Sequence, residues 1–396
     1  MTDTTTSAST ARDVDTGFTA AGISRVVDVL EAGIPDLHDG FQIYVSRHGV
    51  PVIDAAGGHA RPDTPMTTDT LTLWFSSTKP LTAVAIGILW ERGAIALDDL
   101  VRTYIPEFGA GKEAATIRHV LTHRGGFPFA DFGQTGSWDE LVERVMAAPA
   151  NTPPGSAAMY HATAGWVVLG ELVRRVDGRR IDQFVREEIC EPLGMADTWL
   201  GIPAGRLDEL RPKCAEIACK VPADDPARMI FDLPHLNTDA GLTWLSPGGC
   251  GRGPAHDLGK FYEMILGRGE RHGVRIASPQ TIEALTAVSR IGIPDMLITM
   301  TGEDPKWGVD IPWSLGFAPA SQEFGPHASH RAVGHAGHAS SIGYCDPEHG
   351  LAVVVVTNGL AGFERASQRM VALNTAIYSA CGLADEAPTV VDPLGG

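Results

Sequence analysis

Positive charge is scarce in this sequence. Its 396 residues include 31 Lys and Arg against 48 Asp and Glu, which gives a formal net charge of -17. Nucleic-acid phosphates and anionic membrane surfaces bind clusters of Lys and Arg. We therefore expect neither a nucleic-acid partner nor a membrane partner.

Long apolar runs are also missing. No stretch approaches the about 18 consecutive apolar residues of a membrane-spanning helix. Residues 1–16 are rich in Thr, Ser, Ala and Asp, and they have neither the basic start nor the apolar segment of a secretory signal peptide. These features predict a cytoplasmic protein.

Several sequence motifs of known chemistry are absent. The six cysteines form no Cys-x-x-Cys pair, which favours reduced thiols over a disulfide framework. Gly-x-Ser-x-Gly is missing, which excludes the nucleophile elbow of α/β-hydrolases. No phosphate-binding Gly-x4-Gly-Lys-Ser/Thr loop and no Gly-x-Gly-x-x-Gly after a strand occurs, so we expect no nucleotide cofactor.

The apolar pattern that is present predicts an α+β fold. Two β-rich runs at 41–45 and 50–53 flank a turn at Arg47-His48-Gly49, and a second hairpin is expected from 342–345 and 351–357. Helical spacing marks the segments 22–30, 81–90, 116–121, 138–146, 164–176, 181–189, 255–266, 279–287 and 366–381. Strands at both ends with helices between them suggest one sheet and a helical insertion.

This pattern gives the expected domain boundaries. We expect a flexible tail at 1–18, a discontinuous sheet subdomain at 19–75 and 300–385, a mostly helical subdomain at 76–299, and a C-terminal tail at 386–396.

Ser76-x-x-Lys79 is the first candidate for chemistry. Residues three apart on a helix share a face, and the amides and dipole at a helix start favour developing negative charge on Ser76. Burial on the apolar helix that follows would lower the pKa of Lys79, which could then accept the serine proton. The alternative is a helix-capping serine beside a lysine that reaches solvent.

Tyr160 is the second candidate. It precedes a long apolar helix, and a nearby ammonium would favour its phenolate form. Tyr160 and Lys79 could together act as general base and general acid. The alternative is a core tyrosine with a hydrogen-bonded hydroxyl.

The segment 334–338, Gly-His-Ala-Gly-His, is the third candidate. Small residues let a strand edge approach a ligand, and the amide of His338 could join that of Ser76 in an oxyanion hole. A rival interpretation is a metal site, because four histidines lie close together in sequence. These are His327, His330, His335 and His338.

Taken in order, these elements resemble a known family. Similarity to class C β-lactamases, penicillin-binding proteins and, more closely, family VIII carboxylesterases runs over roughly residues 20–385. The matching stretches are Ser76-Ser77-Thr78-Lys79, the segment 116–123, Pro154-Gly155 with Tyr160, Gly248-Gly249, and Gly334–Gly337 with Asp346-Pro347 and Asn358.

The resemblance implies an antiparallel sheet flanked by helices, as in β-lactamases and transpeptidases, with the site between the sheet and a helical domain. It assigns the nucleophile to Ser76, its base to Lys79 and a shared acid/base to Tyr160. The oxyanion donors would be the amides of Ser76 and His338. The substrate pocket would include His335, Gly337, His161 and Trp313.

Departures from the family pattern bear on the substrate. Tyr160-His161-Ala162 lacks the amide of Tyr-x-Asn, and His335-Ala336-Gly337 replaces Lys-Thr-Gly, which removes a permanent cation for a substrate carboxylate. We expect acyl-enzyme hydrolysis of small esters or amides without a carboxylate, and no metal or other cofactor. The alternatives are an acyltransferase that uses an amine or alcohol acceptor, and an inactive binding module.

Overall fold

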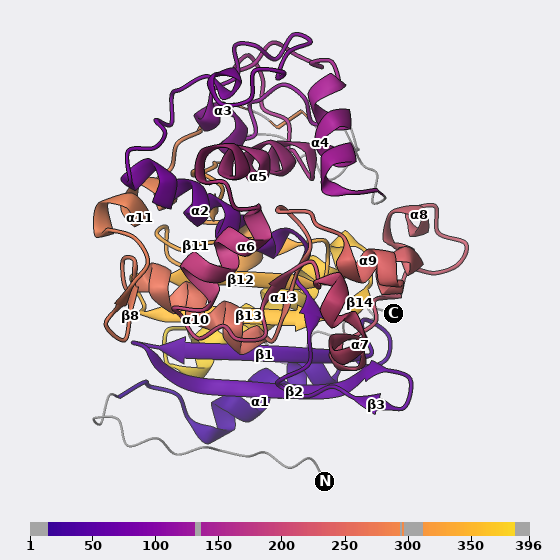
Figure 1. Ribbon diagram of the computed structural model, residues 1–396. Helices are drawn as coiled ribbons and strands as arrows, with labels where there is room; N and C mark the ends of the chain where they lie inside the picture. Colours follow the sequence, from indigo (N-terminus) through magenta and orange to yellow (C-terminus); the bar gives the residue numbers. More distant parts are fainter. Residues whose placement is uncertain (1–14, 131–135, 294, 297–311, 385–396) are drawn as a thin grey trace.

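A seven-stranded antiparallel sheet forms the centre of the molecule (Figure 1). The computed structural model describes residues 15–130, 136–293, 295–296 and 312–384. The strand order is β10-β11-β12-β13-β1-β2-β3, so strands from the two ends of the chain meet at β13 and β1. The strands are β1 Gly40–Arg47, β2 Val50–Arg61, β3 Thr64–Pro65, β10 Ala318–Pro319, β11 Val333–Gly337, β12 Ser341–Asp346 and β13 Leu351–Thr357.

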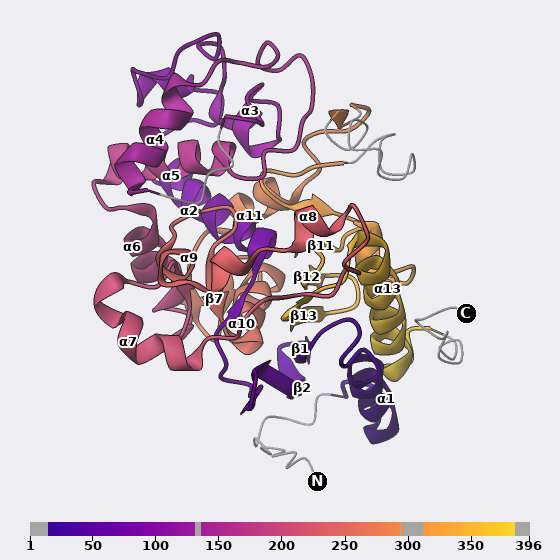
Figure 2. The same cartoon turned by 90° about the vertical axis from the view of Figure 1, so that its right-hand side faces the viewer.

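Both faces of the sheet are covered, which explains the almost continuously apolar sequence of β13. All seven of its residues are buried. Helices α1 (Ala20–Glu31) and α13 (Phe363–Ala380) lie side by side on one face, and α10 (Ala255–Leu266) lies on the other (Figure 2). Helix α10 falls within the range 76–299, so that range contributes to the sheet layers as well as to the helical half.

A glycine sets the close approach of α10 to the sheet. A Cβ atom at Gly259 would overlap the ring of Tyr44 on β1. The Tyr44 hydroxyl in turn donates to Glu263, one turn further along α10, at 2.7 Å. The contact therefore buries an aromatic ring between helix and sheet while satisfying its polar end.

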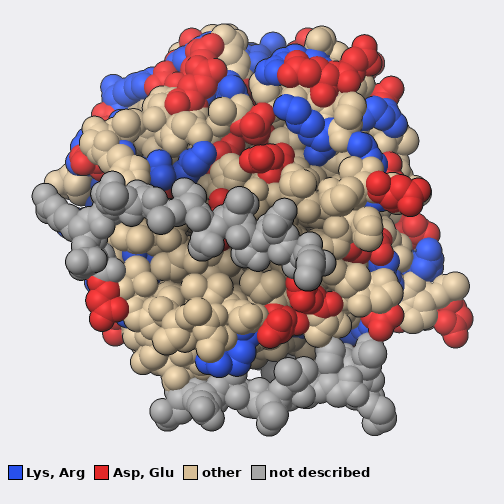
Figure 3. Space-filling view, turned by 90° about the horizontal axis from the view of Figure 1, so that it is seen from below, with Lys and Arg blue, Asp and Glu red and all other residues tan. Residues whose placement is uncertain are grey.

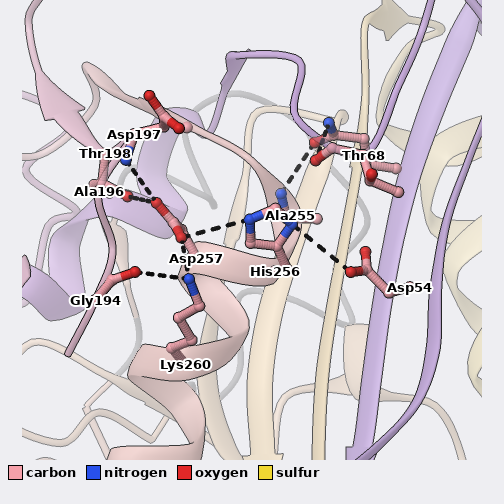
Figure 4. A network of polar contacts seen from close by, with 12 residues as sticks. Asp54, Thr68, Gly194, Ala196, Asp197, Thr198, Ala255, His256, Asp257 and Lys260 are labelled. Atoms are coloured by element: carbon pink, nitrogen blue, oxygen red, sulfur yellow. Dashed lines mark hydrogen bonds and ion pairs between the residues drawn. The ribbon is translucent and has the colours of Figure 1, made fainter. Parts of the chain in front are cut away.

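The start of α10 is also held by a polar network (Figure 4). Asp257, almost fully buried, accepts hydrogen bonds from the Thr198 hydroxyl at 3.0 Å and from Lys260 at 2.7 Å. His256 lies between Asp257 and Asp54 of β2. The network joins β2 of the sheet, through Asp54, to the segment that contains Thr198.

The helical half is built around α2 (Lys79–Glu91). Residues 79–89 are all buried, as expected for a helix that is apolar on every side, and Pro80 falls in the first turn, where it breaks no helical bond. The other helices are α3 Ile117–Leu121, α4 Trp138–Ala147, α5 Ala164–Asp177, α6 Ile181–Val185, α7 Leu207–Leu210, α8 Arg228–Phe231, α9 Asp239–Thr243 and α11 Pro279–Thr286.

Short strands form three smaller sheets beside the central one. The strands β4, β7 and β5 form a small sheet, β6 pairs with β14, and β8 with β9. Their bounds are β4 Thr72–Leu73, β5 Trp199–Leu200, β6 Ala218–Cys219, β7 Gly251–Gly253, β8 Glu270–Arg271, β9 Val274–Arg275 and β14 Gly359–Leu360.

The structure confirms the predicted α+β fold with an antiparallel sheet and helices. One predicted element differs: the helix expected at 181–189 ends as α6 at Val185 and continues as a π-helical turn, Arg186–Cys190. Residues 1–14 and 386–396 lie outside the described residues. Arg47 on β1 donates to the Thr16 carbonyl at 2.8 Å, so the chain contacts the sheet from that point.

The surface carries its charges in mixed groups. Figure 3 shows acidic and basic side chains interspersed around a largely uncharged area on one face of the molecule. Across the described ranges, none of the helices combines the length and the apolar character that crossing a membrane requires.

Candidate active site

Ser76 lies in a short 3-10 turn, Phe75–Thr78, directly before α2. The Trp74 amide donates to the Gly251 carbonyl at 2.8 Å, and the Gly251 amide donates to the Thr78 hydroxyl at 2.9 Å. These bonds fasten the turn to β7. Ser76 therefore lies three residues before α2, close to its expected place at the helix start.

The residue before the serine has a strained backbone. Phe75 has a φ of 45°, in the left-handed region that costs a non-glycine residue on the order of 1–3 kcal/mol. Such a conformation persists only where its surroundings impose it. The strain and the bonds to β7 together fix the direction in which the Ser76 side chain leaves the turn.

Lys79 is fully buried, and its amine has three oxygen neighbours. Nζ lies 2.8 Å from the Ser76 hydroxyl, 2.8 Å from the Gly248 carbonyl and 3.1 Å from the Ala162 carbonyl. Burial lowers the pKa of Lys79 well below its ordinary value of 10.5. A neutral amine has two N–H groups for the two carbonyls and one lone pair, which can accept the proton of Ser76.

Tyr160 supplies the second partner of the serine. Its hydroxyl donates to Ser76 Oγ at 3.0 Å, and the Lys79 amine lies 5.1 Å from the centre of its ring. Burial raises the pKa of Tyr160, so the phenol keeps its proton. The expectation that a neighbouring ammonium would favour the phenolate is wrong, because burial is the largest cause of the shift.

Asp295 holds the backbone of Tyr160 in place. Its buried carboxylate accepts from the Tyr160 amide at 3.0 Å and lies 3.5 Å from the buried Arg290 guanidinium. Arg290 also donates to the Thr122 carbonyl at 3.0 Å. Sequence reasoning missed Asp295, because nothing in its local sequence distinguishes it from a surface carboxylate.

Strand β11 lies against the serine turn. The Ser77 hydroxyl donates to the His335 carbonyl at 2.9 Å. A Cβ atom at Gly337 would overlap the Trp74 carbonyl oxygen, so only glycine permits this approach. His338 follows immediately, and the centre of its ring lies 5.4 Å from that of Phe75, the residue before Ser76.

His335 and Trp313 stand near Tyr160. The His335 ring centre lies 6.2 Å from that of Tyr160 and 5.5 Å from that of Trp313. Burial lowers the pKa of His335 to about 3, so its imidazole is neutral. Its buried Nε2 has no hydrogen-bond partner within the described part of the chain.

His161 has a different environment. Its ring is fully buried, packs against Phe127 and His123, and accepts from the Phe127 amide at 3.3 Å. The ring nearest to Tyr160 on this side is that of His123, with centres 4.6 Å apart. Sequence reasoning gave His123 no role, although it ends the segment 116–123 that carries the family resemblance.

The histidines of the rival metal hypothesis have separate partners. His335 lies by Tyr160, His338 contacts Phe75, and His327 contacts Tyr378. Among the described residues, no three His, Cys, Asp or Glu side chains gather as metal ligands would.

Comparison with known proteins places the chain in a family. A model of the beta-lactamase family matches residues 31–377. The chain belongs to the beta-lactamase family. The resemblance inferred from Ser76, Lys79 and Tyr160 is thereby confirmed, and members of this family and its relatives are serine hydrolases.

Individual beta-lactamase-family proteins are similar over most of the chain. Esterase/beta-lactamase LipL of Mycobacterium tuberculosis is 30% identical over 352 residues, which cover 81% of this chain and 77% of LipL. A penicillin-binding protein homologue from Caulobacter crescentus has a TM-score of 0.74 at 27% identity and covers 92% of this chain and 98% of its own. A family VIII carboxylesterase has a TM-score of 0.73 with the same identity and coverage.

Proposed function

We propose that this beta-lactamase-family serine hydrolase is an esterase-type enzyme that forms an acyl-enzyme on Ser76. The observation that carries the proposal is the environment of one hydroxyl. Ser76 Oγ lies 2.8 Å from the amine of Lys79 and 3.0 Å from the hydroxyl of Tyr160. The first group can accept a proton and the second can donate one.

In the first half-reaction, Ser76 Oγ attacks the substrate carbonyl carbon while its proton moves to Lys79 Nζ. The oxygen of the tetrahedral intermediate accepts from the amides of Ser76 and His338, a type of interaction that contributes about 10²–10³-fold per donor. The bond to the leaving oxygen then breaks. Tyr160 and Lys79 return the proton to that oxygen, which leaves as an alcohol.

In the second half-reaction, water attacks the ester of Ser76. Its proton moves to the Lys79–Tyr160 pair, and the serine oxygen takes the proton back as the acid product leaves. The neutral state of Lys79, maintained by burial, lets both half-reactions run without a fixed counter-ion. No carboxylate pairs with Lys79 among the described residues.

The neutral imidazole of His335 favours the inference that the substrate is uncharged. In the Lys-Thr-Gly pattern of the family, a lysine occupies this position on the strand, and its charge would hold a carboxylate. His335 offers instead one unpaired, uncharged ring nitrogen. We infer a preference for small esters, or amides, that lack a carboxylate beside the scissile bond, in line with the esterase names of LipL and the family VIII carboxylesterase.

The test is labelling and turnover of Ser76→Ala. The wild-type protein should hydrolyse a short-chain p-nitrophenyl ester and gain the mass of one fluorophosphonate adduct, mapped to residue 76. Ser76→Ala should lose turnover by roughly 10⁴-fold or more and remain unlabelled. Ser77→Ala is the matched control and should still be labelled, since Ser77 donates to a backbone carbonyl. Full turnover in Ser76→Ala would overturn the proposal.

The same assay separates the alternatives. Addition of a simple alcohol or amine should leave hydrolysis as the main outcome. Dominant ester or amide products would instead assign the acyltransferase function. An unlabelled wild-type protein without turnover would indicate the inactive binding module.

A further inference from the structure

Two hairpin turns in this molecule have ordinary geometry. The β1–β2 turn consists of His48 and Gly49, with φ of 53° and 77°, and the β8–β9 turn consists of His272 and Gly273, with φ of 49° and 82°. Positive φ at both central residues is the pattern of a type I′ turn, which favours glycine at its second position. Both histidines are exposed.

The hairpin between β11 and β12 also has positive φ at two consecutive residues, but it has no glycine there and its loop is one residue longer, since Gly337 pairs with Ser341. His338 has a φ of 29° and Ala339 a φ of 59°, and the Ser340 amide donates to the Gly337 carbonyl at 2.9 Å. Two consecutive non-glycine residues in the left-handed region cost about 1–2 kcal/mol each. This turn therefore forms only because other contacts impose it.

The side chain of His338 provides one set of those contacts. Three aromatic rings surround its imidazole: Phe231 stacks at 5.1 Å, Phe75 lies at 5.4 Å, and Phe363 meets it edge-on at 5.6 Å. We refer to Phe75, Phe231 and Phe363 as the aromatic clamp. Phe75 is the strained residue directly before Ser76, so the clamp joins the turn to the nucleophile segment.

A hydrogen bond fixes the rotation of the ring within the clamp. His338 Nε2 lies 3.1 Å from the carbonyl oxygen of Ile230 on α8. A carbonyl can only accept, so Nε2 carries the proton. Burial lowers the pKa of His338, which keeps the ring neutral.

Arg369 holds the second residue of the turn. Its buried guanidinium on α13 donates to the Ala339 carbonyl at 3.0 Å. The turn is thus held on two sides. The aromatic clamp and α8 contact His338, and α13 bonds to Ala339. Neither of the exposed turns, at His48 and His272, has a comparable aromatic contact among the described residues.

We propose that the imidazole of His338 is a positioning group that holds the strained turn so that the His338 amide faces the oxyanion formed at Ser76. The proposal rests on the acyl-enzyme function above and adds a role for the side chain, where the oxyanion hole requires only the backbone. The strained turn at His338 and Ala339 costs stability. In return, the ring held in the aromatic clamp fixes the position of the His338 amide.

The deciding variant is the double substitution His338→Asn with Ala339→Gly. Asn-Gly is the preferred type I′ sequence, so the turn should form without strain and the melting temperature should stay the same or rise. The double variant lacks the imidazole that the aromatic clamp holds, so the backbone amide at position 338 becomes free to move. We expect kcat for a p-nitrophenyl ester to fall about 10-fold with little change in KM, because misplaced donors weaken mainly the transition state.

The second measurement is the ratio of kcat for an ester to kcat for its thionoester. If the His338 ring served only the stability of the fold, its loss would leave this ratio unchanged. Sulfur is larger than oxygen and a weaker hydrogen-bond acceptor. An oxyanion hole whose two amides are held in fixed positions therefore strongly favours the ester over the thionoester. The ratio should fall in the double variant. His272→Asn is the matched control, with the same residue and the same backbone region on an exposed hairpin, and it should leave kcat and the ratio unchanged.

Phe231→Leu keeps the proposal testable if the double variant fails to fold. It removes the stacked ring and leaves His338 itself intact, and it should lower the ratio in the same direction by a smaller factor. A stable double variant with wild-type kcat and ratio would overturn the positioning role, as would an unchanged ratio in Phe231→Leu. Full turnover in Ser76→Ala would instead overturn the underlying function, so the two failures are distinguishable.

Discussion

Two lysines among the described residues are fully buried, and their surroundings are similar. Lys79 on α2 and Lys112 in the loop before α3 each donate to two backbone carbonyls and each lie over an aromatic ring. The ring centre is 5.1 Å away for Lys79, at Tyr160, and 5.3 Å away for Lys112, at Phe108. Burial lowers the pKa of both amines.

The two lysines differ in the third neighbour of the amine. Lys79 has the Ser76 hydroxyl at 2.8 Å, whereas the partners of Lys112 within the described ranges are the carbonyls of Met146 and Ala148. A carbonyl can only accept a hydrogen bond, but a hydroxyl can also donate its proton. Burial and carbonyl contacts therefore make an anchor at Lys112, and the added hydroxyl gives Lys79 the neighbour that its proposed role as a base requires.

The largest expected effect is a difference in kcat between variants of these two lysines. Substitution of either by methionine removes the amine and keeps an unbranched apolar side chain. Lys79→Met should reduce kcat by about 10³-fold, because the serine loses its general base. Lys112→Met should leave kcat unchanged and alter only thermal stability. Steady-state kinetics on one ester and melting curves of both variants check this.

Equal kcat losses in the two variants would contradict the comparison, since a shared loss would indicate a general response to a missing buried amine. Addition of a small primary amine provides a further control. It should partly restore turnover in Lys79→Met and should not affect Lys112→Met.

A smaller effect is expected at the aromatic partner. Tyr160→Phe makes the ring beside Lys79 chemically equal to the Phe108 ring beside Lys112. The Ser76 hydroxyl keeps its base and loses its proton donor, so kcat should fall about 10²-fold. Esters with poor leaving groups should be affected most. Phe108→Tyr is the reverse control and should leave kcat unchanged.

The contact between Ser76 and Lys79 could be predicted from sequence because the two residues lie within one helical turn. Spacing of three residues is local, and so is the apolar periodicity that predicted α10 at 255–266 to the residue. The antiparallel sheet followed from two hairpins, each defined by neighbouring runs. These features depend on contacts between residues close in sequence.

The remaining features depend on contacts across the chain. Asp295 holds Tyr160 from 135 positions away, and no local pattern connects them. Lys112, flanked by glycine and glutamate, looks like a surface residue in sequence, but the structure buries it completely. The predicted direction of the Tyr160 pKa shift was wrong for the same reason, because segments distant in sequence bury both the phenol and the Lys79 amine.

The smallest effect expected is a difference in the pH dependence of stability. A lysine whose folded-state pKa lies below 10.5 is protonated in the unfolded chain and neutral in the folded one, so the unfolded state binds more protons. Between those two pKa values, the contribution of that lysine to the free energy of unfolding increases as pH rises. The slope reaches at most about 1.4 kcal/mol per pH unit.

Urea unfolding of the wild-type protein and the two methionine variants from about pH 6 to about pH 9 measures this slope. The stability of Lys79→Met relative to wild type should fall as pH rises, because the variant lacks the proton-linked term. Lys112→Met should show the same sign over a narrower pH range, since the carboxylate of Glu113 opposes the effect of burial and brings the folded-state pKa of Lys112 closer to its ordinary value. Parallel curves for wild type and Lys79→Met would mean that Lys79 is charged in the folded protein, and a charged amine cannot accept the serine proton.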